Sequence, residues 1–370
     1  MILPANPGAG YRALKPEIDA AIARALDSGW YILGQEVRSF EQEFAAWLGT
    51  ARSVGCGNGT DAIVLALRAL GIGPGCAVAT VSHTAVATVA AIEMAGAVPV
   101  LIDIDPRHYT LCPVDLAAVL KAPPPGLPPI KAVLPVHLYG QPVDLDAIGA
   151  LCRQYNLLLI EDCAQAHGAR WHGQMVGTFG AAATFSFYPT KNLGALGDGG
   201  AVAMADEALA DRAAALRQYG WRTHYISDDA GMNSRLDELQ AAILRVKLRH
   251  LDAANDRRRA IAAAYDAALV GSALAPPARR PGADPVFHLY VTRSRDRAAH
   301  QAALRAGGIG TGIHYPQPVH LQPAYRDRIA LGPARCRETE IASSEVLSLP
   351  LYPEMTDAEV GQVCAALRQL

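Results

Sequence analysis

Apolar runs alternate with amphipathic stretches between residue 52 and residue 204 of the chain. The runs at 77–81, 98–102 and 157–160 are largely apolar, which is typical of strands buried on both faces of a sheet. Before the first of them, a short strand is expected at 53–56, and the stretch 60–70 repeats its apolar residues at helical spacing. This alternation predicts an α/β fold whose central sheet is mostly parallel and has helices on both faces.

The pattern continues to residue 205 and changes character after residue 233. Further strands are expected at 130–135, 183–188 and 201–205, and further helices at 86–94 and 144–155. Beyond them the chain predicts long helices at 235–251 and 253–270, a proline-rich segment at 275–285, strands at 287–292 and 312–315, a helix at 296–306 and two final helices. We therefore predict a large domain over residues 1–252, with an N-terminal helical segment, and a smaller α+β domain over residues 253–370.

Composition narrows the classes of function. The 33 basic and 35 acidic residues give a net charge of −2, so no excess charge indicates a nucleic-acid or anionic-membrane partner. The seven cysteines are scattered without C-x-x-C spacing, which argues against disulfides or a zinc site and for a reducing compartment. No signal peptide is visible, and no apolar run reaches the roughly 18 residues needed to span a bilayer. We expect a cytoplasmic protein without a metal site.

A turn with the sequence Gly-Asn-Gly-Thr, at residues 57–60, joins a predicted strand to a predicted helix. Glycines there let backbone N–H groups approach an anion, and the start of a helix adds partial positive charge. Thr60 could cap the helix and also offer its hydroxyl. The turn is a candidate phosphate site, and the alternative is an ordinary tight turn with a helix cap.

Two acidic residues, Glu161 and Asp162, end the most apolar of the predicted strands. Ligands of open α/β sheets bind beyond the carboxyl ends of the strands, where a carboxylate can hold a cationic ring nitrogen. A structural acid would instead cap the following helix. The pattern alone leaves both interpretations open.

The strongest candidate for chemistry is Lys191. It follows the aromatic-rich run 184–188 and precedes the glycine-rich loop 194–200. Burial in such surroundings lowers the pKa of an amine and makes it a usable nucleophile. Most lysines are solvated surface charges, but the sequence Ser-Phe-Tyr-Pro-Thr-Lys-Asn around this one favours a functional role.

These motifs resemble those of a known family. The matching segments are GNGTDA (57–62), EDCAQAHGA (161–169), FSFYPTKNLGALGDGG (185–200), NSRLDELQAAILRVKL (233–248) and HYPQPVH (314–320). They are similar, in this order, to segments of the DegT/DnrJ/EryC1/StrS sugar aminotransferases, which use pyridoxal 5′-phosphate (PLP) and share the type I fold of aspartate aminotransferase. Segments 82–93 and 314–325 look most like enzymes that aminate C3 of a dTDP-linked 3-keto-6-deoxyhexose.

The resemblance implies a ping-pong reaction and a role for individual residues. An amino donor, usually glutamate in this family, would convert PLP to pyridoxamine phosphate, which would then aminate the keto-sugar. Lys191 would bind PLP covalently and shuttle the proton, Asp162 would pair with the protonated pyridine nitrogen, and Gln165 would lie at the phenolic oxygen. The phosphate would be held by Gly59, Thr60 and Ser186, together with Asn233 from the neighbouring subunit of a homodimer. Without the resemblance, Asn233 would be interpreted as a helix N-cap.

The chain departs from the family at Ala85, where many relatives carry an aromatic residue that stacks on the cofactor ring. His83 is the predicted substitute, and the alternative is that His83 only forms hydrogen bonds within a loop. Segments that border the cleft in relatives contain Tyr31, Tyr188, Tyr225, His314, Tyr315 and His320. Of these, we expect Tyr188, His314, Tyr315 and His320 to contact the substrate.

Three alternatives stay open. The same chemistry could act on a 4-keto-hexose, a UDP-linked 3-keto uronate or a keto-cyclitol. A related PLP-dependent sugar dehydratase would carry histidine in place of Lys191, so the lysine disfavours it. A regulator or scaffold without catalysis would not bind PLP through a lysine.

Overall fold

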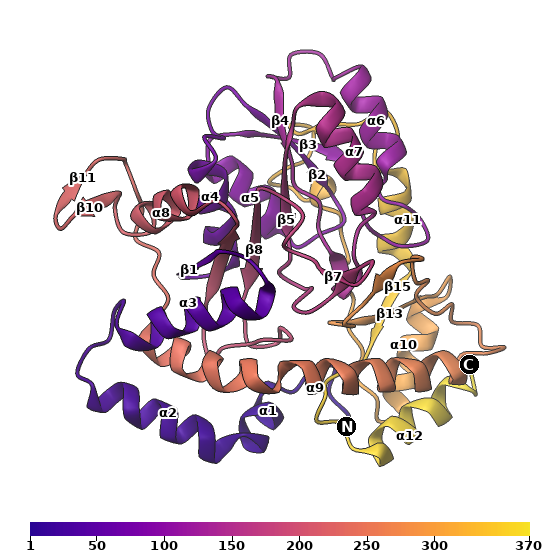
Figure 1. The fold of residues 1–370 in the computed structure, drawn as a ribbon. Helices are drawn as coiled ribbons and strands as arrows, with labels where there is room; N and C mark the ends of the chain where they lie inside the picture. Colours follow the sequence, from indigo (N-terminus) through magenta and orange to yellow (C-terminus); the bar gives the residue numbers. More distant parts are fainter.

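A computed structural model describes residues 1–370 of the chain. An eight-stranded sheet, in the order β1-β9-β8-β5-β4-β2-β3-β14, lies at the centre of the larger part of the molecule (Figure 1). Its strands are β1 (Arg52–Cys56), β2 (Ala77–Val81), β3 (Val98–Ile102), β4 (Ile130–Val133), β5 (Leu158–Asp162), β8 (Ala182–Ser186), β9 (Gly200–Met204) and β14 (Ala330–Leu331).

The prediction of a mostly parallel sheet is confirmed, with one reversed strand. Five of the seven neighbouring pairs are parallel, whereas β9 is antiparallel to both β8 and β1. The reason is the connection: residues 187–199 join β8 to β9 without a crossover helix, so the chain returns in the opposite direction.

Both faces of the sheet are buried under helices, as predicted. Side chains alternate along each strand, so that Ala79 and Val81 of β2 belong to one apolar core and Val78 to the other. The first core is covered by α3 (Gln35–Leu48), α6 (Pro113–Lys121), α7 (Leu145–Tyr155) and α9 (Glu238–Ala268). The second is covered by α4 (Gly59–Ala69), α5 (Val86–Met94) and α8 (Glu207–Leu216).

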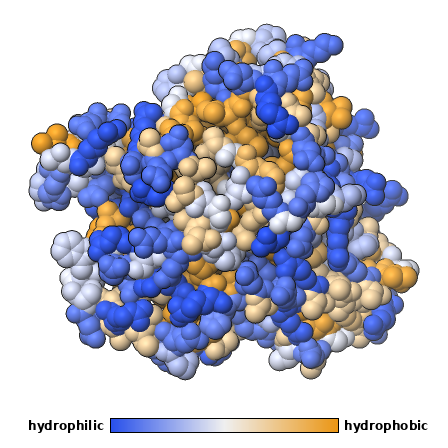
Figure 2. Space-filling view, viewed as in Figure 1, coloured by the Kyte–Doolittle hydropathy of each residue, from blue (hydrophilic) through white to orange (hydrophobic).

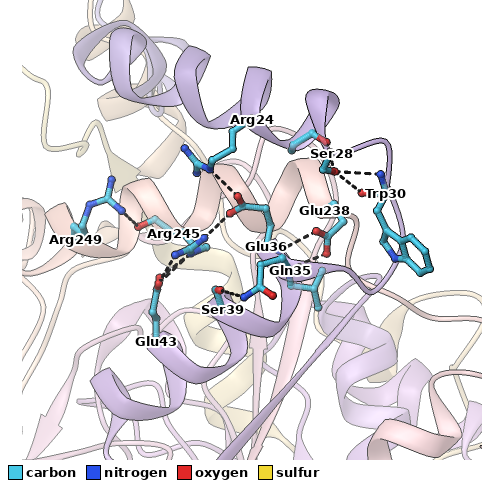
Figure 3. Close-up of polar contacts among 12 residues, drawn as sticks. Arg24, Ser28, Trp30, Gln35, Glu36, Ser39, Glu43, Glu238, Arg245 and Arg249 are labelled. Carbon is cyan, nitrogen blue, oxygen red and sulfur yellow. Dashed lines mark hydrogen bonds and ion pairs between the residues drawn. The ribbon is translucent and has the colours of Figure 1, made fainter.

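Polar contacts fix two of the three N-terminal helices on α9. The three helices are α1 (Pro7–Ala13), α2 (Lys15–Asp27) and α3, and the two with ion pairs to α9 are α2 and α3. The carboxylate of Glu238 accepts hydrogen bonds from three backbone N–H groups at the start of α3, where Gly34 has no side chain to serve as a cap. Arg245 forms ion pairs with Glu36 and Glu43 of α3 (Figure 3). The start of α9 therefore holds α3 at a fixed position beside the sheet.

α9 is one continuous helix, so the prediction of two helices that meet at residue 252 was wrong. Residues 249–256 contain neither glycine nor proline, and nothing in them breaks a helix. In its first half, Ile243 packs against α2, and in its second half, Tyr265 lies in the core of the C-terminal part. The predicted boundary at 252/253 falls inside this helix, and the division into two domains stays a prediction.

The C-terminal part is a small α+β unit. It contains the antiparallel pair β13 (Tyr290–Arg293) and β15 (Val346–Leu349), with α10 (Arg297–Ala306), α11 (Arg337–Glu345) and α12 (Asp357–Leu367). The predicted strand at 312–315 is not formed, because only Gly312 makes a bridge, to Ser348. None of the helices combines the length and the hydropathy that crossing a membrane requires.

Short strands complete the fold. β6 (Arg170–Trp171), β7 (Gln174–Met175) and β12 (Ala283–Asp284) form a three-stranded sheet. β10 (Trp221–Thr223) and β11 (Ile226–Ser227) form a hairpin that stands away from the rest of the molecule, at the left of Figure 1.

Candidate active site

A cavity of about 780 Å³ lies at the carboxyl ends of β5 and β8. Its walls come from the start of α4, the loop after β8, the middle of α9, the N-terminal segment and the C-terminal part. Nine of the twelve predicted site residues line it: Gly59, Thr60, Asp162, Gln165, Ser186, Tyr188, Lys191, His314 and Tyr315. The fold therefore brings together segments that are far apart in the sequence, in a volume suited to a small-molecule ligand.

The turn at the start of α4 forms a cradle of hydrogen-bond donors. Its cap is Asn58, whose side chain accepts the N–H of Asp61 (2.8 Å), so Thr60 lies inside the helix and the prediction that it caps α4 was wrong. A Cβ atom on Gly59 would lie 2.6 Å from the Cβ of Ser186, so only glycine allows this close approach to β8. Backbone N–H groups at a helix start, with the Ser186 hydroxyl beside them, are suited to binding a phosphate.

Asp162 places a buried carboxylate at the end of β5. One oxygen accepts the hydroxyl of Thr88 (2.9 Å) and the other accepts the N–H of Ala164 (3.1 Å). Burial raises the pKa of Asp162, more than these hydrogen bonds and the charge of Lys191 lower it. A cationic ligand group beside it would therefore stabilise its ionised form.

Glu161, the adjacent acid, has a structural role. Neighbouring residues of a strand point to opposite faces, and Glu161 accepts three backbone N–H groups of the segment 177–180 and one bond from His137 (3.1 Å). His137, Glu161 and Cys163 lie within reach of a common ion, but both nitrogens of His137 already have protein partners, the second being the N–H of Val143. The structure thus separates the two acids that the sequence left equivalent.

Lys191 lines the cavity, and its amine makes no hydrogen bond with the protein. Burial lowers the pKa of Lys191 to about 8, against the opposing effect of the Asp162 charge. An amine with this pKa is partly neutral near neutral pH and can act as a nucleophile or a base.

A hydrogen-bond network joins the C-terminal part to the cavity floor. Gln165 donates to the hydroxyl of Tyr315 (3.0 Å) and accepts the N–H of Tyr139 (2.7 Å), and the Tyr139 hydroxyl donates to the carbonyl of His314. Burial lowers the pKa of His314, whose ring contacts the hydroxyl of Ser348 (2.9 Å). Sequence analysis missed Tyr139, which belongs to no recognised motif; its φ of 61° is the one unusual feature, and only the structure reveals it.

His83 lies outside the cavity lining. Its ring contacts the hydroxyls of Tyr139 (2.8 Å) and Ser343 (3.3 Å), and burial lowers its pKa to about 4. Thr84 and Ala85 line the cavity at this level instead. These contacts are those of the hydrogen-bonding alternative, and the predicted stacking on a cofactor ring receives no support from them.

His320 and Asn233 also lie outside the lining, as do the exposed Tyr31 and Tyr225. His320 is buried between Ser82 (2.7 Å) and Glu340 (3.1 Å), so its predicted substrate contact is not supported. Asn233 is exposed and forms a β-bridge with Gln218, and the N-cap of α9 is Asp237. The interpretation of Asn233 as an N-cap was therefore wrong, and its role across a dimer stays a prediction.

Residues 12–368 match the DegT/DnrJ/EryC1/StrS aminotransferase family. The chain belongs to this family. The aminotransferase is 46% identical to the dTDP-3-amino-3,4,6-trideoxy-alpha-D-glucose transaminase of Streptomyces venezuelae. The alignment of 362 residues covers 98% of this chain and 94% of the relative. It is 40% identical to the UDP-2-acetamido-2-deoxy-3-oxo-D-glucuronate aminotransferase of Pseudomonas aeruginosa, over 96% of each chain.

The crystal structure of S. venezuelae DesV in complex with a ketimine intermediate is also similar, with a TM-score of 0.94 at 46% identity. It covers 100% of this chain and 98% of that chain. These similarities confirm the predicted family and fold, and aminotransferases of this family depend on PLP.

The cavity of the aminotransferase fits this cofactor. The cradle that a Cβ on Gly59 would fill could hold the phosphate, and the buried carboxylate of Asp162 could pair with the pyridine nitrogen. The free amine of Lys191 could bind the aldehyde carbon. Three separate groups of the cofactor thus each find a matching group of the protein.

The pKa of Lys191 gives a testable pH dependence. We expect apoenzyme to combine with PLP faster as the pH rises, with a midpoint near 8, because only the neutral amine attacks an aldehyde. Stopped-flow absorbance would follow the reaction, and pyridoxamine phosphate, which needs no lysine, serves as the control ligand. A midpoint near 10.5, the value of an unperturbed lysine, would contradict the environment described for Lys191.

Proposed function

We propose that this aminotransferase moves an amino group from an amino acid, L-glutamate, to C3 of a dTDP-linked 3-keto-6-deoxyhexose. The observation that carries the proposal is the free amine of Lys191 and the buried carboxylate of Asp162 in one cavity. The 46% identity to a dTDP-3-amino-sugar transaminase supports the choice of sugar and carbon.

The protein groups divide the work of such a transfer. When bound, PLP supplies an electron sink for the electron pair left behind when a proton leaves Cα of the amino donor. Asp162 would hold a proton on the pyridine nitrogen of the cofactor, which would make the ring a stronger sink. Nζ of Lys191 would take the proton from Cα of the donor and return it to the bound cofactor, and its depressed pKa suits both transfers at near-neutral pH. The second half of the reaction uses the same groups in reverse.

Aromatic residues at the cavity support a sugar as the acceptor. Tyr188 is 53% exposed at the rim, and His314 and Tyr315 line the interior. Flat aromatic faces with a polar edge suit the alternation of C–H and O–H groups on a sugar ring. The Gln165–Tyr315 and Tyr139–His314 hydrogen bonds hold two of these residues in place before the sugar arrives.

The test compares keto-sugars made by synthesis. With glutamate as donor, we expect kcat/KM for a dTDP-3-keto-6-deoxyhexose to exceed that for the dTDP-4-keto isomer by roughly tenfold or more. NMR of the product would show nitrogen at C3. A UDP-linked 3-keto uronate is the second candidate, because of the 40% identical relative, and a higher kcat/KM for it would replace the dTDP-sugar. A keto-cyclitol belongs in the same panel, and a protein that only regulates would aminate none of these substrates.

We also propose a homodimer in which Asn233 of one subunit reaches the phosphate site of the other. Large apolar side chains that a monomer leaves in water support it: Trp30 (65% exposed), Tyr31 (52%), Tyr225 (76%) and Ile226 (59%). Figure 2 shows apolar surface at the end of the β10–β11 projection. Analytical ultracentrifugation that found only monomers at micromolar concentration would refute this.

The seven free cysteines support a cytoplasmic location.

A further inference from the structure

Arg258 is a buried cation without an ionic partner. It lies on α9, is 5% exposed and lines the cavity. Its Nη1 donates hydrogen bonds to three carbonyl oxygens, of Phe287 (3.3 Å), His288 (3.5 Å) and Leu351 (3.1 Å). Its Nε has no partner, and no carboxylate lies within ion-pair distance of the guanidinium.

Two other arginines of low exposure, Arg217 and Arg280, also have an Nε without a partner, but each of them has a counter-charge. Arg217 forms an ion pair with Glu41, and Arg280 contacts both Asp105 and Asp144. A buried charge without a counter-charge is costly, because desolvation is not offset by attraction. Arg258 therefore differs from them in a way that a bound anion would correct.

The charge of Arg258 persists at neutral pH. Burial lowers its pKa to about 10, and the negative charge of Glu354, which lines the same cavity without forming an ion pair, opposes this effect. A guanidinium in this state keeps its Nη2–H groups free of hydrogen bonds to the protein, and these can donate to a carboxylate oxygen.

Arg258 lies close to the reacting lysine. Asn255, on the same face of α9 and three residues earlier, accepts a hydrogen bond from Asn192 (2.9 Å), the neighbour of Lys191. His288, whose carbonyl accepts a bond from Arg258, contacts Asn192 through its ring (3.3 Å). Burial lowers the pKa of His288, and the charges of Lys191 and Arg258 lower it further, so both cations act on this histidine.

We propose that Arg258 binds a carboxylate of the amino donor. This rests on the proposed function, in which glutamate is the donor. The donor must place its Cα at Nζ of Lys191, so its carboxylates stay within a few bonds of that atom. The diphosphate of a nucleotide sugar is bulkier and lies farther from the reacting carbon, and it suits the open rim better than a buried arginine.

The test uses holoenzyme and no sugar. Arg258→Gln should lower kcat/KM for L-glutamate in the half-reaction that converts bound PLP to pyridoxamine phosphate by roughly 10- to 100-fold, the usual effect of losing a charged hydrogen bond. The Kd of glutarate, a dicarboxylate without an amine, should rise by a similar factor in calorimetry. The matched control is Arg259→Gln, because Arg259 lies on the same helix, pairs with Asp256 and Asp284, and does not line the cavity.

The outcomes are decisive in each direction. In Arg258→Gln, the rate at which the pyridoxamine phosphate form reacts with the keto-sugar should change less than about twofold, since no donor is present in that step. If only the rate of the sugar step fell, the proposal would be overturned in favour of diphosphate binding. If the rates of both steps fell equally and the melting temperature also fell, it would be overturned in favour of a structural role.

Two further measurements cover a variant that fails to fold. Arg258→Lys keeps the charge and loses the planar fork, so it should weaken glutarate binding less than Arg258→Gln does. In a crystal of wild-type holoenzyme with glutarate, a carboxylate on the Arg258 guanidinium supports the proposal, and glutarate bound elsewhere overturns it. Because glutarate binding involves no sugar, a wrong sugar assignment leaves this result unaffected.

Discussion

Replacing Lys191 with alanine should abolish amino transfer, with a loss of about a thousandfold or more, because the group that moves the proton is gone. The fold should survive, since the amine of Lys191 makes no hydrogen bond with the protein and lies at a cavity rather than in the packed core. Single-turnover rates with glutamate would measure the loss, and circular dichroism would check the fold. In the wild type, borohydride reduction and peptide mapping should find the cofactor attached to residue 191.

Lys121→Ala is the matched control, because Lys121 is an exposed lysine in the last turn of α6 and should leave the rate unchanged. If Lys191→Ala kept substantial turnover while holding its cofactor, Lys191 would not be the proton carrier. Cofactor found on another lysine would refute the site as a whole.

Asp162→Ala should be the next most damaging change. Without the carboxylate, the pyridine nitrogen loses the partner that keeps it protonated, and a shift of one to three pKa units in that nitrogen corresponds to roughly 10- to 1000-fold in rate. Thr88 and Ala164 would also lose their acceptor, so part of the effect would be structural. Rates of the glutamate half-reaction and the thermal stability of each variant separate the two contributions.

Asp162→Asn provides that separation. Asparagine keeps the size of the side chain and one oxygen acceptor but carries no charge, so it should retain most of the stability and little of the activity. Near-wild-type turnover in the Asn variant would mean that the carboxylate acts only as a hydrogen-bond acceptor, and the electron-sink role of Asp162 would be lost with it.

Local patterns in the sequence predicted much of the sheet and many of its helices. The strands 77–81 and 98–102 and the helix 86–94 have the predicted bounds, because continuous apolar runs and helical periodicity are properties of short segments. What depends on distant segments was missed. β14 pairs with β3 only after the chain has left the large sheet and come back.

The same distinction holds for the candidate site. Gly59, Asp162 and Lys191 belong to motifs that a sequence can reveal, and they do line one cavity. His320 lies in such a motif too, but its side chain turns into a buried contact with Ser82, and proximity in sequence could not show this. Arg258 carries no local signal at all: one of three consecutive arginines in a helix becomes notable only when its missing partner can be seen.

The unbroken course of α9 has a consequence for motion. Because one helix runs from the core of the large sheet into the C-terminal core, bending at residue 252 would have to break its backbone hydrogen bonds. We therefore expect the two cores to move as one rigid body, and not to close on each other about a hinge at residue 252. Entry and exit of ligands would then depend on segments that line the cavity but lie outside this rigid body. The main one is the N-terminal segment that precedes α2.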